Sequence, residues 1–324
     1  MSRWFLLFVV FALPISALAQ IQRVYPDRPV RLVVPFQVGG AADQLARVLS
    51  ECLSEAFRQT VWVDNKPGAT GSIGTRQVAR AAADGYTLLI GHSDSIVLQG
   101  LMHPNREKDV ASGLMPIAFV GRIPGVLIAR PELGIKSPKD LIQRAKQRPG
   151  QLKLASWGMG STIHLGIEWM NQSANIELLH VPYAGTPAAV AAFYADQVDL
   201  VFVTADMALT AAQAGLAQIV GASSRDLALQ TPGMPWLGDQ GFEGLQLDTW
   251  YGVLAPVNTP AAIVAQLQRE ILKQLKNPQV TAKLKQAGFQ LGPLGAADFS
   301  DLIRRERKFW QNLIAERRIP VLPD

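Results

Sequence analysis

One stretch near the start of the chain restricts the fold more than any other. Residues 30–36 are mostly apolar and β-branched, which predicts a buried strand. Gly39 and Gly40 end this run, and glycine allows the backbone to turn tightly or to approach a ligand closely. Apolar residues then recur at three- and four-residue spacing from Leu45 to Phe57, which predicts a helix. The free N–H groups at the start of such a helix form a potential anion site beyond the strand end.

Strand and helix patterns alternate along the rest of the chain. Ser137-Pro138 and Thr259-Pro260 each place a capping residue before a proline, as does Gly185-Thr186-Pro187, and this arrangement is typical of a helix start. Alternation with short connections predicts parallel sheets covered by helices, with ligands outside the carboxyl ends of the strands. The predicted strands are 30–36, 60–63, 86–90, 126–129, 153–156, 178–183, 198–203, 218–222 and 250–254.

Both halves of the chain contain glycine-rich strand-to-helix turns, without a repeat of fixed period. If the two halves face each other, helix N-termini from both sides point into one cleft. The positive ends of those helices attract negative charge, and a carboxylate is the small anion that best fits such a site. We therefore expect a cleft that binds a small carboxylate.

The first residues indicate export. Met1–Arg3 is basic, Trp4–Leu13 is apolar, and Ala17-Leu-Ala19 is a small-x-small cleavage pattern. A membrane anchor is the alternative, but the apolar run is shorter than the ~20 residues that span a bilayer. We expect a cleaved signal peptide over residues 1–19 and a mature protein in the periplasm.

Composition and motif spacing indicate several absences. The net charge is +5 and is spread along the chain, without the aromatic–basic interleaving of nucleic-acid binders. Cys52 is the only cysteine, so we expect no disulfide framework. The loop 68–74 is glycine-rich but lacks the Gly-Lys-Ser/Thr ending of a phosphate-binding loop. The four histidines, His92, His103, His164 and His180, are scattered and show no metal-ligand spacing. We therefore expect no metal and no cofactor.

Short motifs occur in a fixed order along the whole mature chain. They are Tyr25-Pro26, Val34-Pro35-Phe36, Gly39-Gly40, Asp43, 64–74, 84–88, Gly158-Met-Gly-Ser161, His164-Leu165, 180–185, Val198-Asp-Leu200, Trp250-Tyr-Gly252, Ala255-Pro256 and Thr259-Pro260. Together they resemble the solute-binding proteins of tripartite tricarboxylate transporters, the Bug or TctC family.

The resemblance implies a type II periplasmic-binding-protein fold. In that fold two α/β domains are joined by two crossover segments, and the ligand lies in the cleft between them. We expect domain 1 to comprise 25–125 plus 249–324, and domain 2 to comprise 126–248. The resemblance also implies a protein that captures a small carboxylated solute for a membrane permease or a sensor. No sequence feature indicates an oligomer, so we expect a monomer.

The resemblance carries family ligand positions onto this chain. Several lie at the starts of the expected helices, and others lie at or beside the ends of predicted strands. The positions carried over are Gly40, Ala41, Asp43, Gly160, Ser161, His164 and Thr186. Three residues at or just after predicted strand ends complete the expected ligand-binding set: Ser93, Tyr183 and Thr204.

Two departures from the family pattern bear on the ligand. Ala41-Ala42 stands where relatives commonly have Ser or Thr, which leaves backbone amides as the donors. Val203-Thr204 stands where many relatives carry Asp-Asn, and a valine cannot hold an ammonium group. We therefore expect a plain mono- or dicarboxylate, including aromatic acids, rather than an amino acid.

Several residues have a second interpretation. Asp43 complements the positive end of its helix whether or not it contacts a ligand. Ser161 is a typical N-cap, but Ser161 and His164 also invite a nucleophile–base interpretation, as in a secreted two-domain α/β hydrolase. The surrounding sequence is not the Gly-x-Ser-x-Gly elbow and no acid partner is evident, so we expect binding without catalysis.

Overall fold

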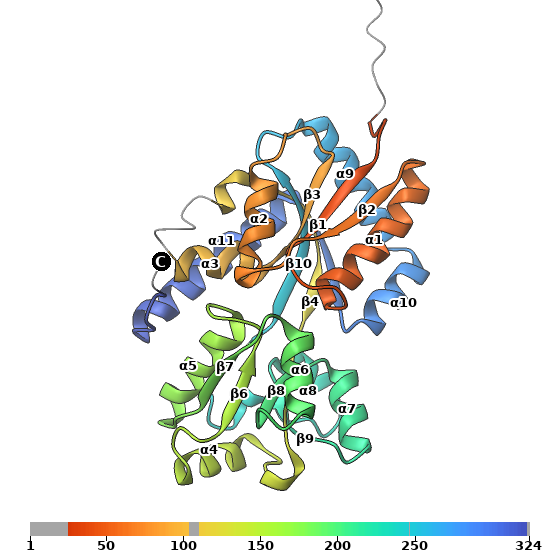
Figure 1. Cartoon of the computed structure of the whole chain (residues 1–324). Helices are drawn as coiled ribbons and strands as arrows, with labels where there is room; N and C mark the ends of the chain where they lie inside the picture. The colour runs from red at the N-terminus through yellow and green to blue at the C-terminus, as the bar shows by residue number, and fades with distance from the viewer. Residues whose placement is uncertain (1–24, 104–109, 246, 323–324) are drawn as a thin grey trace, which may run out of the picture.

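The computed structural model describes residues 25–103, 110–245 and 247–322, which form two α/β domains, each built on one sheet (Figure 1). The two-domain α/β architecture is therefore confirmed. The signal peptide expected over residues 1–19 lies outside the described residues. Within the described ranges, every helix is too short or too polar to cross a membrane.

The first domain has a mixed six-stranded sheet in the order β11-β4-β10-β3-β1-β2. Strand β1 pairs in parallel with β2 and β3, whereas β10 runs antiparallel to both β3 and β4. The strands are β1 (Val30–Val34), β2 (Val61–Asn65), β3 (Thr87–His92), β4 (Leu114–Ile123), β10 (Thr249–Pro256) and β11 (Gln290–Gly295).

The expected parallel pairing holds for β1, β2 and β3, but the sheet as a whole is mixed. Strand β4 leads from the first domain to the second, and β10 leads back, so these neighbours run in opposite directions. Strand β11 then adds to the edge antiparallel to β4. Neither β4 nor β11 was among the strands predicted from the sequence.

Helices cover the faces of this sheet. The apolar stripe of α1 (Ala41–Phe57) is buried, as its spacing predicts, and includes Leu45, Leu49 and Leu53. The other helices are α2 (Ser72–Ala79), α3 (Gln99–Met102), α9 (Ala261–Gln274), α10 (Pro278–Gln286) and α11 (Ala296–Glu316), with short helical turns at η1 (Ala69–Gly71), η2 (Asp94–Leu98) and η3 (Ala111–Gly113).

The second domain has a five-stranded sheet in the order β7-β6-β8-β5-β9, in which β5 runs antiparallel to β8 and β9. Its strands are β5 (Val126–Ala129), β6 (Lys153–Ser156), β7 (Leu179–Pro182), β8 (Leu200–Val203) and β9 (Gln218–Ala222). Its helices are α4 (Pro138–Gln147), α5 (Thr162–Ala174), α6 (Thr186–Tyr194), α7 (Ala205–Gln213) and α8 (Arg225–Gln230), with turns at η4 (Pro131–Leu133) and η5 (Leu237–Asp239).

The two crossover segments lie side by side. Ser223, which follows β9, bonds to both segments: the Gly125 N–H donates to Ser223 Oγ at 2.8 Å, and the Leu247 N–H donates to the Ser223 carbonyl at 3.3 Å. Thr249 Oγ1 donates to the Ile123 carbonyl at 3.4 Å. The two crossover segments are therefore joined by hydrogen bonds at a single position between the domains, an arrangement that is typical of a hinge.

The end of α11 makes a further link between the domains. Arg317, directly after α11, donates from Nη1 to Ser173 Oγ at 2.9 Å, and Gln172 Nε2 donates to the Arg317 carbonyl at 2.8 Å. Figure 1 shows the blue end of α11 reaching toward α5. Trp169 of α5 and Trp310 of α11 belong to one buried apolar cluster, so the hydrophobic core continues across the domain boundary.

Candidate functional site

Two adjoining cavities lie at the domain boundary. The smaller, about 430 Å³, is called the α1 cavity because residues 39–42 at the start of α1 form part of its wall. The larger, about 760 Å³, is called the α2 cavity because residues 67–73 before and at the start of α2 line it. Both volumes lie within the usual range of small-molecule sites. The two cavities share four residues: Phe36, Gln37, Trp157 and Gly185.

Three helices begin at the wall of the α1 cavity. The start of α1 comes from the first domain, whereas the starts of α6 and α7, at Thr186 and Thr204, come from the second. None of these three helices has a side-chain hydrogen bond at its N-cap. Because the first N–H groups of a helix have no partner within the helix, this wall offers backbone donors and positive helix ends to an anion.

Asp43 holds the glycine turn at the start of α1 in place. Its Oδ2 accepts hydrogen bonds from the Gly39 N–H at 3.0 Å and from Arg47 Nε at 2.9 Å. Its Oδ1 accepts from Asn65 Nδ2 at 3.0 Å and from Arg47 Nη2 at 3.1 Å. Burial raises the pKa of Asp43, but these hydrogen bonds and the Arg47 charge outweigh burial and hold the pKa below its usual value. The carboxylate thus fixes the glycine turn and does not line either cavity.

The walls of the α1 cavity are largely apolar and aromatic. The Phe36 ring meets His92 edge-on with centroids 4.9 Å apart, and His92 meets Tyr251 in the same way at 4.7 Å. Burial lowers the pKa of His92, against the opposing effect of Asp94, so the imidazole is neutral near pH 7. Among the described residues that line this cavity, Asp206 is the single Asp, Glu, Lys or Arg.

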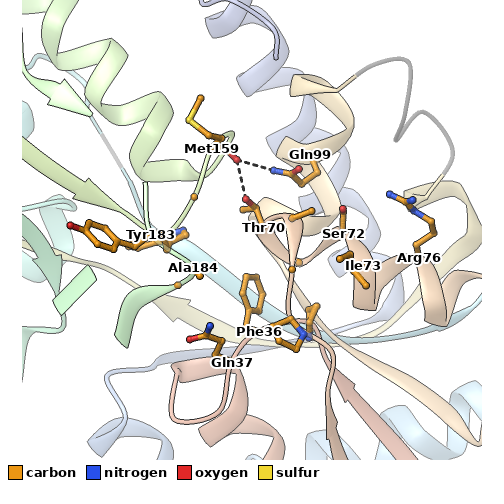
Figure 2. Close-up of a pocket in the computed structure, with 18 of the residues that line it drawn as sticks. Phe36, Gln37, Thr70, Ser72, Ile73, Arg76, Gln99, Met159, Tyr183 and Ala184 are labelled. Atoms are coloured by element: carbon orange, nitrogen blue, oxygen red, sulfur yellow. Dashed lines mark hydrogen bonds between the residues drawn. The ribbon is translucent and has the colours of Figure 1, made fainter. Parts of the chain in front are cut away.

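The α2 cavity contains polar contacts between the domains. Thr70 Oγ1 donates to the Met159 carbonyl at 3.0 Å, and Gln99 Nε2 donates to the same oxygen at 3.4 Å. Figure 2 shows both side chains pointing at Met159, with Tyr183 and Arg76 at opposite sides of the view. Arg76 is the one cationic side chain among the described lining residues.

The start of α5 is occupied by an acid of the protein itself. Asp94, fully buried at the end of β3, accepts a hydrogen bond at Oδ2 from Trp157 Nε1 at 2.7 Å. Its Oδ1 accepts from the Thr162 N–H at 3.2 Å and also from the Thr162 hydroxyl. A carboxylate from the first domain therefore sits at a helix N-terminus of the second, where the sequence suggested a ligand position.

Ser161 and His164 form hydrogen bonds at the N-terminus of α5. Ser161 Oγ accepts from the His164 backbone N–H at 3.3 Å, as an N-cap does. His164 Nδ1 accepts from the Gly160 N–H at 3.0 Å, and its ring stacks on His180 at 4.3 Å. Burial lowers the pKa of both imidazoles, and that of His180 falls to about 4 with a further contribution from His164. The lone pair at His164 Nδ1 is thus engaged by backbone rather than by Ser161.

A second serine–histidine pair, Ser156 and His180, is partly buried. Ser156 Oγ lies 2.6 Å from His180 Nε2, and it accepts the Gly158 N–H at 3.1 Å. Ser156 is fully buried at the end of β6, so the pair fixes the exit loop of that strand.

The structure divides the expected ligand-binding residues into three groups. Four line the α1 cavity, namely Gly40, Ala41, Thr186 and Thr204. Tyr183 lines the α2 cavity. The others line neither cavity and are buried in the surrounding structure: Asp43, Ser93, Gly160, Ser161 and His164.

Sequence reasoning missed three side chains of the cleft. Asp206 lies in the first turn of α7, where a search for acids at helix starts finds it. Asp94 follows a predicted strand end, but its partners are 63 and 68 residues away and no local pattern indicates them. Phe36 was named only in the predicted strand and in the motif Val34-Pro35-Phe36, not as a ligand-binding residue, although it helps to line both cavities.

The chain matches a known protein family and is similar to known proteins over most of its length. Residues 45–319 match the model described as the tripartite tricarboxylate transporter family receptor. The chain is 35% identical over 305 residues to the UPF0065 protein in the tcbD-tcbE intergenic region of Pseudomonas sp. strain P51, covering 94% of this chain and 90% of that protein.

Solved structures agree with this match over nearly the whole chain. Rpa4515 of R. palustris with adipate is 29% identical, has a TM-score of 0.85, and is covered over 92% of this chain and 100% of that one. MatC (Rpa3494) of Rhodopseudomonas palustris with bound malate is 26% identical and has a TM-score of 0.79, with 90% and 100% covered.

Proposed function

Because the chain belongs to the tripartite tricarboxylate transporter family of receptors, we propose that it is a periplasmic solute-binding protein for a small carboxylate. The α1 cavity is the proposed binding site. The chain start, with its signal-peptide pattern over residues 1–19, supports export to the periplasm.

One observation carries the proposal: three uncapped helix N-termini from both domains open on one small cavity with largely apolar walls. Backbone N–H groups and helix dipoles bind a carboxylate without a cationic side chain, and the apolar walls bury its carbon body. Two similar structures hold carboxylates, adipate in one and malate in the other, which supports the same chemistry in this chain.

Binding is proposed to favour a closed arrangement of the two domains. The proposed domain limits are 25–125 plus 249–324 and 126–248, which follow the division of the two sheets and the paired crossovers. A ligand held by α1 on one side and α6 on the other binds the closed form best and shifts the equilibrium toward it. A membrane permease of the tripartite type is the proposed recipient of the solute.

The proposed role is binding without catalysis. A hydrolase built on Ser161 requires a base directed at its hydroxyl oxygen. In the structure that oxygen caps α5, and His164 Nδ1 accepts the Gly160 N–H. The geometry therefore favours the binding protein over the hydrolase.

A thermal-shift screen of mature protein tests the proposal. The panel comprises amino acids, aliphatic and aromatic monocarboxylates, dicarboxylates and tricarboxylates. At a hundredfold excess over its Kd, a ligand that binds only the folded state stabilises it by about 2.7 kcal/mol. We expect at least one carboxylate to raise the Tm, and the absence of a shift with every carboxylate would contradict the proposal.

A matched pair of variants locates the binding. Ala41 and Ala296 each follow a glycine N-cap at the first position of a long helix, but Ala41 alone lines the α1 cavity. An acid at a helix start is compatible with helix stability. Ala41→Glu should abolish the ligand-induced shift and Ala296→Glu should leave it unchanged. Equal shifts in both variants would place the ligand elsewhere.

A further inference from the structure

We propose that the α1 cavity selects carboxylates with one acidic group and an apolar, planar body, and discriminates against dicarboxylates. This inference rests on the proposed function and names the class of ligand within it. It follows from where the protein places two of its own acids, Asp94 and Asp206, and from the side chains that remain.

The first acid removes a position for a second ligand carboxylate. Asp94 is fully buried and uses both oxygens on donors of the second domain, Trp157 Nε1 and the Thr162 backbone and hydroxyl. The start of α5 is therefore already neutralised. A ligand carboxylate directed there meets a buried negative charge instead of free N–H groups, which opposes binding.

The second acid acts at α7. Asp206 lies in the first turn of that helix and lines the α1 cavity. It offsets the positive end of α7 and repels a second negative group on the ligand. Among the described residues of this cavity no Lys or Arg is present to balance a second carboxylate.

The positions left for a carboxylate are the starts of α1 and α6. The first turn of α6 contains no acid, and the acid of α1, Asp43, is bound to Gly39, Arg47 and Asn65. These two helices belong to opposite domains, so one carboxylate held between them links the domains. The structure thus provides for one anionic group.

The rest of the cavity suits a flat apolar body. Phe36, Trp157, Phe202 and Tyr251 contribute aromatic surface to its wall. Aromatic rings favour edge-to-face and offset contacts with another ring, beyond the burial of apolar area. Asp94 holds the Trp157 indole by its N–H, which fixes the orientation of this wall.

Two ligand pairs test the inference on the unmodified mature protein. Benzoate is compared with terephthalate, and hexanoate with adipate, by isothermal titration calorimetry at constant ionic strength. The members of each pair have a similar body and differ by one carboxylate. We expect the monocarboxylate to bind at least tenfold more tightly in each pair, with benzoate tighter than hexanoate.

The possible failures are distinguishable. A dicarboxylate that binds as tightly as its partner, or more tightly, overturns this inference but leaves the proposed function intact. Aspartate or glutamate as the tightest ligand of the wider panel has the same consequence, with Asp206 then accepting the ammonium group. If no carboxylate of any kind binds, the proposed function itself fails.

A matched pair of variants tests the role of Asp206. Asp206 and Asp226 are both exposed acids in the first turn of a helix of the second domain, but only Asp206 lines the α1 cavity. Asp206→Asn should improve terephthalate binding about two- to fivefold relative to benzoate, the effect of one partly screened charge. Asp226→Asn should not change the ratio. If the ratio of terephthalate to benzoate affinity is unchanged in both variants, Asp206 does not contribute to the discrimination against dicarboxylates.

Discussion

The carboxylate of Asp94 accepts a hydrogen bond from the indole N–H of Trp157 at 2.7 Å, and this bond joins the two domains. Asp94 follows β3 in the first domain, whereas Trp157 follows β6 in the second. Trp157 is also one of the residues shared by both cavities. The bond therefore couples the arrangement of the domains to the shape of the site.

Trp157→Phe removes the donor and retains an aromatic ring. Because hydrogen bonds to charged groups contribute roughly 1.5–3 kcal/mol, we expect a loss of that size in the free energy of unfolding, measured by urea denaturation. Trp236→Phe is the control, because the Trp236 indole N–H is buried without a partner among the described residues. Equal losses in the two variants would show that ring size, not the Asp94 bond, sets the effect.

Gly158 is required for the close approach of the domains. It has φ +136°, and a Cβ atom there would lie 2.6 Å from Thr70 Oγ1 of the other domain. Gly158→Ala should hold the domains apart, enlarge the radius of gyration of the ligand-bound protein in X-ray scattering, and weaken ligand binding roughly tenfold.

Gly215 provides the control for backbone strain. It also has positive φ, +71°, but a Cβ atom there meets no atom within 4 Å. Gly215→Ala should lower stability without changing the radius of gyration or the Kd. A Gly158→Ala protein that closes normally on ligand would contradict the steric account.

Asp43 should stabilise the protein in a pH-dependent manner. Its pKa in the folded protein is below the usual value, so its contribution is present above the unfolded pKa and is lost as the pH falls through the folded pKa. Asp43→Asn should lower the free energy of unfolding by about 1–3 kcal/mol at pH 7, and the difference should shrink as the pH falls below about 4.

The control for Asp43 is an exposed ion pair on a helix. Asp301 and Arg304 are paired three residues apart on α11, with both side chains more than half exposed. Asp301→Asn should change the free energy of unfolding by less than about 0.5 kcal/mol. A difference between wild type and Asp43→Asn that does not vary with pH would contradict the ionic role of Asp43.

The contribution of Glu306 to stability should depend on pH in the opposite direction to that of Asp43. Burial raises the pKa of Glu306 to about 7, although Arg122 and a hydrogen bond from Trp310 act against this rise. The folded state then binds more protons than the unfolded state between pH 4.5 and 7, so stability from this group falls as the pH rises through that range. Glu306→Gln should therefore stabilise the protein by about 1–3 kcal/mol at pH 8 and have little effect near pH 4.

The pH scan of Glu306→Gln is compared with Glu132→Gln. Glu132 also pairs with an arginine, Arg130 at 2.8 Å, but its side chain is 55% exposed. We expect the Glu132 variant to lie within about 0.5 kcal/mol of wild type at both pH values. A Glu306→Gln protein less stable than wild type at pH 8 would show that the Arg122 pair outweighs burial.

Local patterns predicted much of the fold. The strand, glycine turn and helix around Gly39 and Gly40 form as β1 and α1, and Ser137 caps α4 as its sequence indicates. Of the two crossover strands, β10 was predicted as 250–254, but β4 was missed because it carries no clear strand signal near its start and its antiparallel partners are set by the return of the chain through the hinge. Strand β11 contains one proline, two glycines and two leucines in a short, partly exposed run, and this composition hides the strand from sequence patterns.

The site was predictable only in part. Four residues of the α1 cavity could be predicted, because helix starts can be recognised from short motifs: Gly40, Ala41, Thr186 and Thr204. Ser161 and His164 do not line this cavity, because Asp94 reaches the same helix start from a distant part of the chain. Asp94 binds a helix start of the other domain, whereas Asp43 is held by Asn65 within its own domain. Tertiary contacts decide between these arrangements, and no spacing rule contains them.

A crystal structure of the mature protein with the tightest carboxylate of the panel would locate the ligand directly. We expect the carboxylate in the α1 cavity, with its oxygens about 3 Å from backbone N–H groups of residues 40–42 and 186. A carboxylate bound instead to Arg76 in the α2 cavity, away from these helix starts, would contradict this expectation.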